Sequence, residues 1–587
     1  MRALRRTLGA LCAVTALAAP SPATASNAEL VTVTKDSATA TWTTAEPSDT
    51  VFCIGRSSAA ERCSAQETGV RLHYATLDGL EPGVRYAYEL RSAGAAEPVS
   101  DANPGSFVTL TPPPGRHLFD FAVLNDLHVG EECAGTATSA PLLGTSIPAC
   151  FSAPAYAERM DSAIVAEIAG KGIDLTLVNG DVTAEARPEE AARAKEVLAG
   201  LPGQVLVARG NHDRVHADRP SCGADGDCFR STFYPGRAPG RIYGSADSHG
   251  VHFVWLDSVK GSSTGDLTDD AQNAWFGRDL AANRRKPTFV FFHHPASEYA
   301  DTLQSEPVIF GVPPTAGGAE FLSTVAANPQ IVGVFQAHTH RNFNSYGREA
   351  GSRTPFVENG TSKEYPGGYS VVSVYEGGYT RSYFRPRDCE FCREWTETTR
   401  GEYQGAAPEY LLGSLGTRNF SHVHDCPGSP PAQSVAGNES LATGGVATPP
   451  AACLDRVRRP PGTDPPGASG TGASPGGASL SVAAAGRTVR IRRGRGVLRL
   501  RCRSGGPCRA RGRMVGRVGR RHAVTLARIG GIVPDAATGT VRVALTRTGR
   551  RLLRRSAPVR GRARIAVAGG SGQRRRVGGR LVLRRAR

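Results

Sequence analysis

The sequence of 587 residues lacks several features, and each absence excludes a class of structure or function. After residue 25 there is no apolar run close to the about 20 residues that a membrane-crossing helix needs. The C-terminal stretch 481–587 contains 31 arginines but no lysine, no aromatic residue and only one acidic residue, Asp535. Without aromatic side chains on which bases could stack, this stretch is not expected to recognise single-stranded nucleic acid specifically. The mature chain is therefore expected to contain no transmembrane segment.

The one marked apolar run lies at the N-terminus. Residues 1–25 combine a basic start, about a dozen apolar residues and the small residues Ala23-Thr24-Ala25, which is the pattern of a secretory signal peptide. The apolar run is too short to cross a bilayer. We therefore expect export, which leaves the mature chain secreted (extracellular) or associated with the cell wall.

The cysteines support an oxidising destination. Of 13 cysteines, Cys12 lies in the signal peptide, and the even number that remains favours disulfides. Close spacing predicts the pairs Cys53–Cys63, Cys133–Cys150, Cys222–Cys228 and Cys502–Cys508. The pairing of the other four is open; they are Cys389, Cys392, Cys426 and Cys453. Because His422 and His424 lie nearby in the sequence, a zinc site at Cys389 and Cys392 is the alternative to a disulfide.

Five short polar motifs each follow an apolar run. Runs such as FDFAVLND and QVLVARGNHD are typical of buried strands that end in turn residues. In open α/β sheets, sites form beyond the carboxyl ends of strands. We therefore expect one site built from five strand ends. The motifs are Asp126-Leu127-His128, Gly180-Asp181, Gly210-Asn211-His212-Asp213, His293-His294-Pro295 and His338-Thr339-His340.

The donor types and their spacing suit two metal ions. Asp126 and His128 are two residues apart, so an extended backbone would point both to one side. His338 and His340 share this spacing, which is about 6–7 Å along an extended chain. That separation suits one imidazole on each of two ions about 3.5–4 Å apart.

The motifs and their order resemble those of the calcineurin-like metallophosphoesterases: D-x-H, G-D, G-N-H-D, H-x-P and H-x-H. The resemblance implies an α/β fold of four layers, in which two mixed sheets pack together between helices. It implies that one ion is held by Asp126, His128, Asp181 and His340, and a second by Asp181, Asn211, His293 and His338. His294 would lie behind these ligands. Asp181 would bridge the ions, and Asn211 would add a neutral oxygen.

The resemblance also implies roles in catalysis. His212 would act as a general acid to the leaving oxygen or stabilise the transition state, and Asp213 would orient or charge it. The two cations would polarise the phosphoryl oxygens and supply a hydroxide that attacks phosphorus. The chain is thus expected to be an exported phosphoric ester hydrolase, with phosphomonoesters favoured and phosphodiesters as the alternative. A cell-surface binding protein without catalysis is the alternative from another class.

A missing tyrosine bears on the metals. Purple acid phosphatases, a branch of this superfamily, place a ferric-iron-binding tyrosine three residues after the bridging aspartate, where this chain has Ala184. They also lack a histidine at the position of His128. A histidine ligand favours divalent Mn, Zn or Fe, so we expect two divalent ions of open identity.

The flanking regions differ from the centre in composition. Residues 28–112 alternate as β-strands do, and the stretch 77–88 resembles the turn and strand of a fibronectin type III domain, with Trp42 as its core aromatic. Such a domain precedes the catalytic domain in purple acid phosphatases. The expected organisation is a signal peptide at 1–25, a fibronectin type III-like β-sandwich at 28–112, a metallophosphoesterase domain at 116–385, a cysteine-containing extension at 386–426, a Pro/Gly/Ser-rich linker at 427–478 and an Arg-rich β domain at 479–587.

The Arg-rich stretch is patterned as well as charged. Aliphatic residues alternate with arginine in TVRIRRGRGVLRLRCR and GTVRVALTRTG, which predicts a small β-sandwich with guanidinium-rich faces. Its net charge of +30 suits an anionic wall polymer, a membrane surface or extracellular nucleic acid. A merely solvated, arginine-rich module is the alternative.

Overall fold

The computed structural model divides the chain into two compact units, Met1–Thr463 and Asp464–Arg587. The residues that the structure describes in the first unit are 26–59, 61–134, 151–215, 222, 225–259, 264–296, 315–347, 349, 352–400 and 408–424. In the second unit they are 481–484, 488–491, 495–503, 508–518, 522–533, 538–546, 551–553, 559–568 and 574–585. The predicted signal peptide and linker lie outside these residues, as do Cys150, Cys426 and Cys453.

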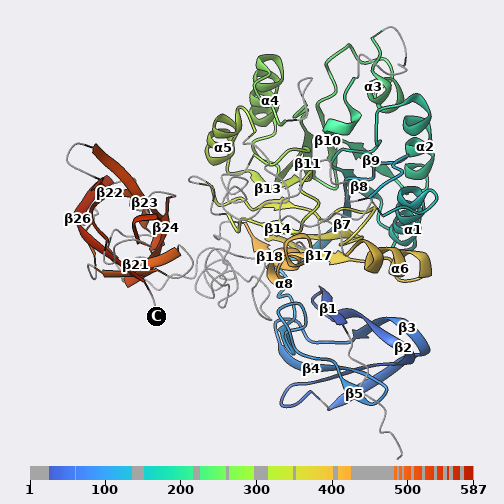
Figure 1. The fold of residues 1–587 in the computed structure, drawn as a ribbon. Coiled ribbons are helices and arrows are strands. Elements are labelled where there is room, and N and C mark those ends of the chain that lie inside the picture. The colour runs from blue at the N-terminus through green and yellow to red at the C-terminus, as the bar shows by residue number, and fades with distance from the viewer. Residues whose placement is uncertain are drawn as a thin grey trace, which may run out of the picture. The chain divides into compact units, whose positions relative to one another are not determined.

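The N-terminal part of the first unit is an antiparallel sheet (Figure 1). Its strands are β1 (Ser26–Val33), β2 (Ser37–Gly55), β3 (Arg62–Asp78), β4 (Arg85–Ser92), β5 (Ala95–Ala96) and β6 (Ser106–Val108). Alternate residues of these strands form one core, in which Trp42 is 2% exposed. Strands β1, β2, β4 and β6 lie on the alternating segments AELVTVTKDSATATWTTA, TVFCIG, RYAYELRS and GSFVTL, whereas β3 and β5 were not expected. Likeness to a fibronectin type III domain stays a prediction.

The central part contains two mixed sheets. The first has the order β18-β17-β16-β7-β8-β9, and the second β10-β11-β12-β13-β15-β14. The strands of the first are β7 (His117–Leu124), β8 (Leu175–Val178), β9 (Gln204–Val207), β16 (Tyr369–Tyr375), β17 (Gly378–Phe384) and β18 (Phe420–Val423). Those of the second are β10 (Gly244–Ser248), β11 (Val251–Trp255), β12 (Thr288–Phe291), β13 (Ile331–Gln336), β14 (Phe343–Asn344) and β15 (Phe356–Glu358).

Aromatic side chains join the two sheets face to face. Phe121 of β7 lies with its ring centroid 5.1 Å from that of Phe289 and 5.9 Å from that of Phe335, both in the other sheet. The next residue along β7, Ala122, packs on the opposite face in a cluster with helix residues such as Ile164. This alternation follows from the period of two in a strand. It gives β7 two buried faces over most of its length.

Helices cover both outer faces, which completes the four layers predicted from the sequence (Figure 1). Helices α1 and α2 cover the sheet of β7, and α4 and α5 cover the sheet of β12. The helices of the first unit are α1 (Tyr156–Gly170), α2 (Pro188–Leu198), α3 (Cys228–Phe233), α4 (Asp270–Ala282), α5 (Gly318–Ala327), α6 (Glu390–Thr399), α7 (Pro408–Leu412) and α8 (Leu415–Arg418). Three of them, α1, α2 and α4, lie on the sequence stretches AYAERMDSAIVAEIAGKG, PEEAARAKEVLAG and TDDAQNAWFGRDLAAN, which have helical patterns.

The second unit forms one eight-stranded sheet, β19-β21-β24-β23-β22-β25-β26-β20. Its strands are β19 (Ser481–Ala484), β20 (Thr488–Ile491), β21 (Arg495–Arg503), β22 (Cys508–Val518), β23 (His522–Val533), β24 (Thr538–Leu545), β25 (Val559–Ala568) and β26 (Arg574–Arg585). Neighbouring strands pair antiparallel except β20 and β26. The strands fall on the predicted alternation, although one hydrogen-bonded sheet takes the place of a two-sheet sandwich.

Three disulfides lie among the described residues of the first unit: Cys53–Cys63, Cys222–Cys228 and Cys389–Cys392. The first two are the predicted pairs. The third replaces the zinc site that was the alternative for Cys389 and Cys392, because both sulfurs are used in the S–S bond. The side chains of Cys502 and Cys508 are outside what the structure describes.

Candidate metal centre

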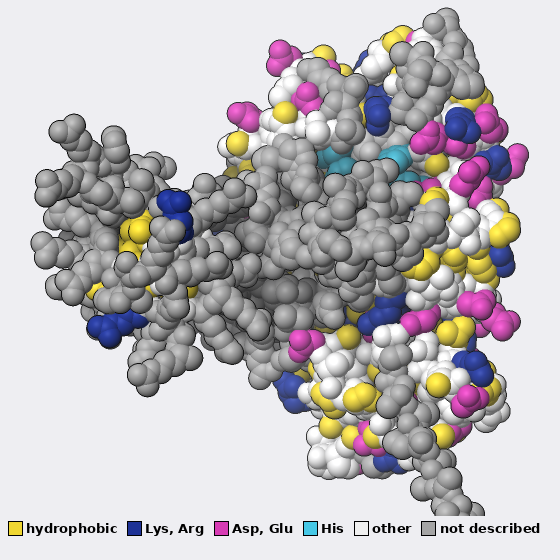
Figure 2. Space-filling model, in the orientation of Figure 1, with side chains coloured by type: hydrophobic (Ala, Val, Ile, Leu, Met, Phe, Trp, Pro, Cys, Tyr) yellow, Lys and Arg dark blue, Asp and Glu magenta, His cyan; other side chains and the backbone are white. Residues whose placement is uncertain are grey.

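The five predicted motifs meet at one edge of the paired sheets. Each begins within three residues of a strand's carboxyl end: β7, β8 and β9 in the first sheet, β12 and β13 in the second. Figure 2 shows histidine side chains reaching the surface on one face of this part of the molecule. The donor residues form four overlapping groups, and within each group the donor atoms lie within 4.8 Å of one another. They are Asp126/His128/His340, His128/Asp181/His212, Asp126/Asp181/His293 and His293/His294/His338.

The backbone at these positions is left-handed. The φ angles of Asp126, His128, Asp181, His338 and His340 are 53°, 47°, 52°, 71° and 55°. This corrects the extended backbone that we expected at Asp126–His128 and His338–His340. Residues with such sparsely populated backbone conformations are typical of functional sites, where the surrounding structure sustains the strain. The paired donors converge through turns.

The first group of donors comprises Asp126, His128 and His340, together with Asp181, which it shares with the second group. The Nε2 of His340 lies 3.6 Å from Oδ1 of Asp126, and the Nε2 of His128 lies 3.5 Å from Oδ2 of Asp181. These distances exceed those of hydrogen bonds. All four side chains are at most 10% exposed. The donors thus face a common point without bonding directly to one another.

Asp181, Asn211 and His293 form the second group, and His338 lies beside it. The Nε2 of His293 is 3.1 Å from Oδ2 of Asp181 and 3.0 Å from Oδ1 of Asn211, and its Nδ1 donates to the carbonyl of Asn179. The ring centroid of His338 lies 5.1 Å from that of His293. His338 thus joins the second group and His340 the first, the same partition that the resemblance implies.

His294 lies behind this group. Its backbone N–H donates to Oγ of Ser258, and its Nδ1 lies 3.0 Å from the same oxygen. Its ring centroid lies 4.6 Å from that of His338. This contact with Ser258 places the ring next to His338, and His293, His294 and His338 together form one of the four donor groups.

The residues present fit bound metal. Both ring nitrogens of His128 are buried and have no hydrogen-bond partner among the described residues, which is costly unless another ligand is bound. Gly210 leaves room for the carboxylate of Asp181, because a Cβ there would lie 2.1 Å from its Oδ1. Gly180 likewise has a φ of 95° and no room for a Cβ beside Gly210. The mixture of imidazole, carboxylate and amide donors suits divalent transition metals.

Protonation of the metal-free site follows from the same geometry. Burial would lower the pKa of His293, but the neighbouring carboxylate of Asp181 outweighs burial and raises it to about 9. Burial would raise the pKa of Asp181, yet His293 and His212 hold it well below its ordinary value. The imidazolium of His293 thus supplies the positive charge that Asp181 needs. A metal ion would take over that role, because ligands bind metal in their deprotonated forms.

His212 and Asp213 are not paired as we predicted. The Nδ1 of His212 lies 2.6 Å from the carbonyl of Ala184, to which it donates. Asp213 is 1% exposed and accepts four hydrogen bonds, which are from Val182 N, Thr183 N, Thr183 Oγ1 and Gly210 N. These bonds use the carboxylate to join the loops after β8 and β9. Asp213 therefore positions the loops, and the carbonyl of Ala184 orients His212.

Several supporting residues had no signal in the sequence. Glu364 accepts a hydrogen bond of 2.8 Å from Nδ1 of His340, and Lys363 lies between Glu364 and Glu131. Neither belongs to a short motif. Glu131 follows His128 by three residues, a spacing that could have been noticed.

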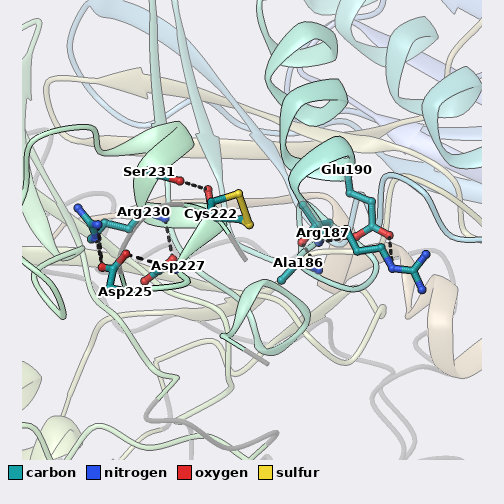
Figure 3. Close-up of a disulfide and its surroundings, with 10 residues drawn as sticks. Ala186, Arg187, Glu190, Cys222, Asp225, Asp227, Arg230 and Ser231 are labelled. Atoms are coloured by element: carbon teal, nitrogen blue, oxygen red, sulfur yellow. Dashed lines mark hydrogen bonds and ion pairs between the residues drawn. A yellow bond between two sulfur atoms is a disulfide. The ribbon is translucent and has the colours of Figure 1, made fainter. Parts of the chain in front are cut away.

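Arg209 anchors the loop that carries Asn211. It pairs with Asp257 at 2.5 Å and with Asp227 at 3.3 Å. Asp227 is also the N-cap of α3, where it accepts from the N–H of Arg230, and the Cys222–Cys228 disulfide closes the preceding loop (Figure 3). The apolar-run pattern could not show these long-range partners.

The central domain is similar to known proteins in two comparisons of the sequence. The model of the calcineurin-like phosphoesterase family matches residues 119–342, which include every predicted donor. The glycerophosphodiester phosphodiesterase GpdQ of Enterobacter lignolyticus (strain SCF1) is 30% identical over 173 residues. The match covers 28% of this chain and 56% of that protein, so the chain spans little more than half the length of this relative.

Solved structures with low sequence identity also resemble the chain. A purple acid phosphatase from yellow lupin (Lupinus luteus) seeds has 14% identity and a TM-score of 0.32, with 63% of this chain and 73% of that chain covered. A dimetal phosphatase from Danio rerio has 13% identity and a TM-score of 0.33, with 46% and 96% covered. The central part of this chain, residues 119–342, thus matches the calcineurin-like phosphoesterase family, and the clustered donors lie within that match.

Proposed function

We propose that the chain is an exported phosphodiesterase whose site uses two divalent ions, held by the seven donors at the five strand ends. The observation that carries this proposal is that Asp181 belongs to two neighbouring donor groups, one with His128 and His212 and the other with Asp126 and His293. Asp126, His128, Asp181 and His340 would hold one ion; Asp181, Asn211, His293 and His338 would hold the other. When bound, the ions would supply electrophilic activation of the phosphoryl group and an activated water.

His212 would handle the proton of the leaving group. Because its Nδ1 donates to the carbonyl of Ala184, Nε2 is the atom left to carry or release a proton. Its backbone N–H donates to Oδ1 of Asp181 at 2.8 Å, which holds the imidazole next to the shared carboxylate. His212 is partly exposed, so Nε2 can reach a substrate. Asp213 keeps the two loops in register and takes no part in the proton transfer.

A diester substrate is supported by the relative that shares the motifs, which is named for glycerophosphodiester hydrolysis. The phosphomonoester preference that we expected from the sequence is the other outcome of the same assay. The catalytic ligands are common to both reactions, because ligands set the chemistry and the surrounding loops set the substrate. Manganese, zinc and ferrous iron all suit the mixed donor set.

The test is a substrate panel on the full chain. Protein stripped with a chelator is reloaded with one divalent metal at a time and assayed with p-nitrophenyl phosphate and bis-p-nitrophenyl phosphate. We expect metal-dependent cleavage of both, with the higher kcat/KM for the diester. A higher kcat/KM for the monoester would reverse the substrate preference. Absence of cleavage with every metal would refute the enzymatic proposal and favour a binding protein.

We also propose a partner for the second unit, a polymer of phosphodiesters at the cell wall. Strand register places Arg513 directly opposite both Arg528 and Arg564, and Arg562 opposite Arg580. Like charges opposite one another destabilise a sheet, and a bound polyanion would offset this cost. The full chain should bind immobilised polyphosphodiester, and added salt should release it. Equal binding to anionic vesicles would favour a membrane surface, and detection of the chain in the cytoplasm would refute export.

A further inference from the structure

A chain of buried charges connects the two histidines of the first donor group from behind. Nδ1 of His340 donates to Oε1 of Glu364 over 2.8 Å, and Oε2 of Glu364 lies 2.6 Å from Nζ of Lys363. The same Nζ lies 2.5 Å from Oε2 of Glu131. The other oxygen of Glu131, Oε1, is 3.6 Å from Nδ1 of His128. We call Glu131, Lys363 and Glu364 the Lys363 cluster.

The Lys363 cluster is too deeply buried to be an ordinary surface ion pair. The side chains of Lys363 and Glu364 are 1% and 0% exposed. Oε2 of Glu364 faces the ammonium of Lys363, and Oε1 accepts from Nδ1 of His340, so the proton of His340 sits on Nδ1. Its Nε2 then faces Asp126 with a lone pair.

Hydrogen bonds from two helices hold the residues of the cluster and the neighbouring Tyr365 in place. Nε1 of Trp395, in α6, donates to the carbonyl of Lys363 at 2.9 Å, and the N–H of Tyr365 donates to Oγ1 of Thr399 in the same helix. Tyr156 of α1 donates its hydroxyl to Oε2 of Glu131. Two helices thus fix both ends of the cluster. A cluster needed only for stability could be replaced by apolar side chains at little cost.

We propose that the Lys363 cluster is a positioning device that sets the affinity of the first donor group, Asp126/His128/Asp181/His340, for its metal ion. This inference rests on the proposed dinuclear function. Carboxylates that accept from a ligating imidazole fix its tautomer and make it a stronger donor. Glu364 accepts from His340 in this way, and Lys363 holds both carboxylates in place. Glu131 lies 3.6 Å from Nδ1 of His128, beyond a hydrogen bond, and acts on that imidazole through its charge. In the second group, His293 donates instead to the neutral carbonyl of Asn179.

The inference predicts an effect confined to one of two ions. In Glu364→Gln the amide keeps the size of the side chain but removes its charge. We expect the affinity of one ion to fall by roughly 10–100-fold, while the other ion binds as in the wild type. Cobalt titration, followed by the visible spectrum and by metal analysis after gel filtration, measures both steps without reference to activity. Turnover should return towards the wild-type value when metal is saturating.

Glu190→Gln is the matched control. Glu190 is 3% exposed and accepts from the backbone N–H groups of Glu185 and Arg187, but no contact with a histidine is found among the described residues. It should leave both metal affinities unchanged. If Glu364→Gln does not fold, Glu131→Gln tests the same cluster at a position that is 17% exposed. It should weaken the same ion.

Two results are distinguishable from one another. Wild-type protein that binds fewer than two ions would refute the proposed dinuclear function. Wild-type protein that binds two ions, with unchanged stepwise affinities in Glu364→Gln and Glu131→Gln, would refute the positioning role alone. Equal weakening of both ions would also refute it, since among the described residues the cluster's contacts with donors are those with His128 and His340.

Discussion

Glu29 of β1 is predicted to be the strongest electrostatic link between the N-terminal sheet and the central domain. Its side chain is 1% exposed; one oxygen accepts from the hydroxyl of Tyr365 at 2.8 Å, the other from Nη1 of Arg385 at 2.7 Å. Arg400 contacts the same carboxylate. Tyr365 follows Glu364 directly, so the N-terminal sheet supports the segment behind His340. Glu29→Gln would leave both guanidinium groups without their anion.

The size of the effect follows from the pKa of Glu29. Burial would raise this pKa, but Arg400, Arg385 and Tyr365 lower it from 4.5 to about 2. A tenfold change in proton affinity corresponds to about 1.4 kcal/mol, so the difference is worth about 3 kcal/mol of unfolding free energy. Because the folded-state pKa is the lower one, this stability is present above pH 4.5 and is lost as the pH falls towards 2.

Glu397 is the other titratable carboxylate at this junction, and it acts in a different pH range. Burial, with a further contribution from Glu29, raises its pKa to about 7, against the opposing charge of Arg400. The ionised form of Glu397 is therefore disfavoured, and its protonation adds stability as the pH falls from 7 to 4.5. Below pH 4.5, the change of the unfolding free energy with pH therefore reports on Glu29 without the effect of Glu397.

The assay is urea unfolding of the metal-free chain between pH 2.5 and pH 7. Glu29→Gln should lose about 3 kcal/mol at pH 5 to 7, and the difference from the wild type should shrink as the pH approaches 2.5. Glu46→Gln removes the exposed pair with Arg71 in the same sheet and should cost below about 1 kcal/mol. A Glu29→Gln loss as small as that of the control, or one that does not shrink in acid, would refute the reasoning.

Three further predictions concern the site and its surroundings. His212→Ala should keep its metals and lower kcat by about 10²–10⁴-fold, which single-turnover kinetics and metal analysis would separate; metal loss would contradict its assigned role. Chelation should lower the melting temperature, because each ion present at 100 times its Kd stabilises by about 2.7 kcal/mol; an unchanged value would contradict a metal held by folded protein. Burial raises the pKa of Asp161 well above its ordinary value despite the hydrogen bond from Ser362. Ionisation of this buried carboxyl group therefore costs stability as the pH rises. Asp161→Asn should have a higher melting temperature than the wild type at pH 8 but not at pH 4.

Local pattern was sufficient for the elements that carry the site. The apolar runs of β7, β8, β9, β12 and β13 and the motifs after them need only the two-residue period and turn chemistry to be recognised. The same reasoning missed β3 because residues 62–71 of this strand are mostly exposed and show no apolar alternation, and β3 pairs only with β2. A strand segment that is exposed on both faces shows no alternation of apolar and polar residues in its sequence.

The contacts behind the ligands needed the tertiary structure. His340 and Glu364 are 24 residues apart, and Glu29 and Tyr365 are 336 apart. No periodicity relates such pairs, because each depends on how layers far apart in sequence are stacked. The role of Asp213 was misjudged for the same reason: adjacency to His212 in sequence suggested a pair, whereas the 3-10 turn at Asn211–Asp213 directs its carboxylate to the neighbouring loop.

The left-handed backbone at the donors also has a consequence for stability that is separable from function. Asp181 has a φ of 52°, where a residue with a Cβ is strained by roughly 1–2 kcal/mol relative to glycine. In the wild type, hydrogen bonds such as that from the N–H of His128 to the carbonyl of Asp181 at 2.9 Å sustain this conformation. Asp181→Ala removes the shared carboxylate but keeps the strain, whereas Asp181→Gly removes both.

Both variants should therefore lose metal loading, yet the glycine variant should unfold at higher urea than the alanine variant. The expected difference is about 1 kcal/mol, reduced from the full strain because glycine gains entropy in the unfolded chain. Metal analysis and urea unfolding of the two metal-free proteins measure the two effects independently. A glycine variant no more stable than the alanine variant would show that the turn at Asp181 is relaxed. In that case the donors would be held in place by metal, and the preformed loops would not explain the site.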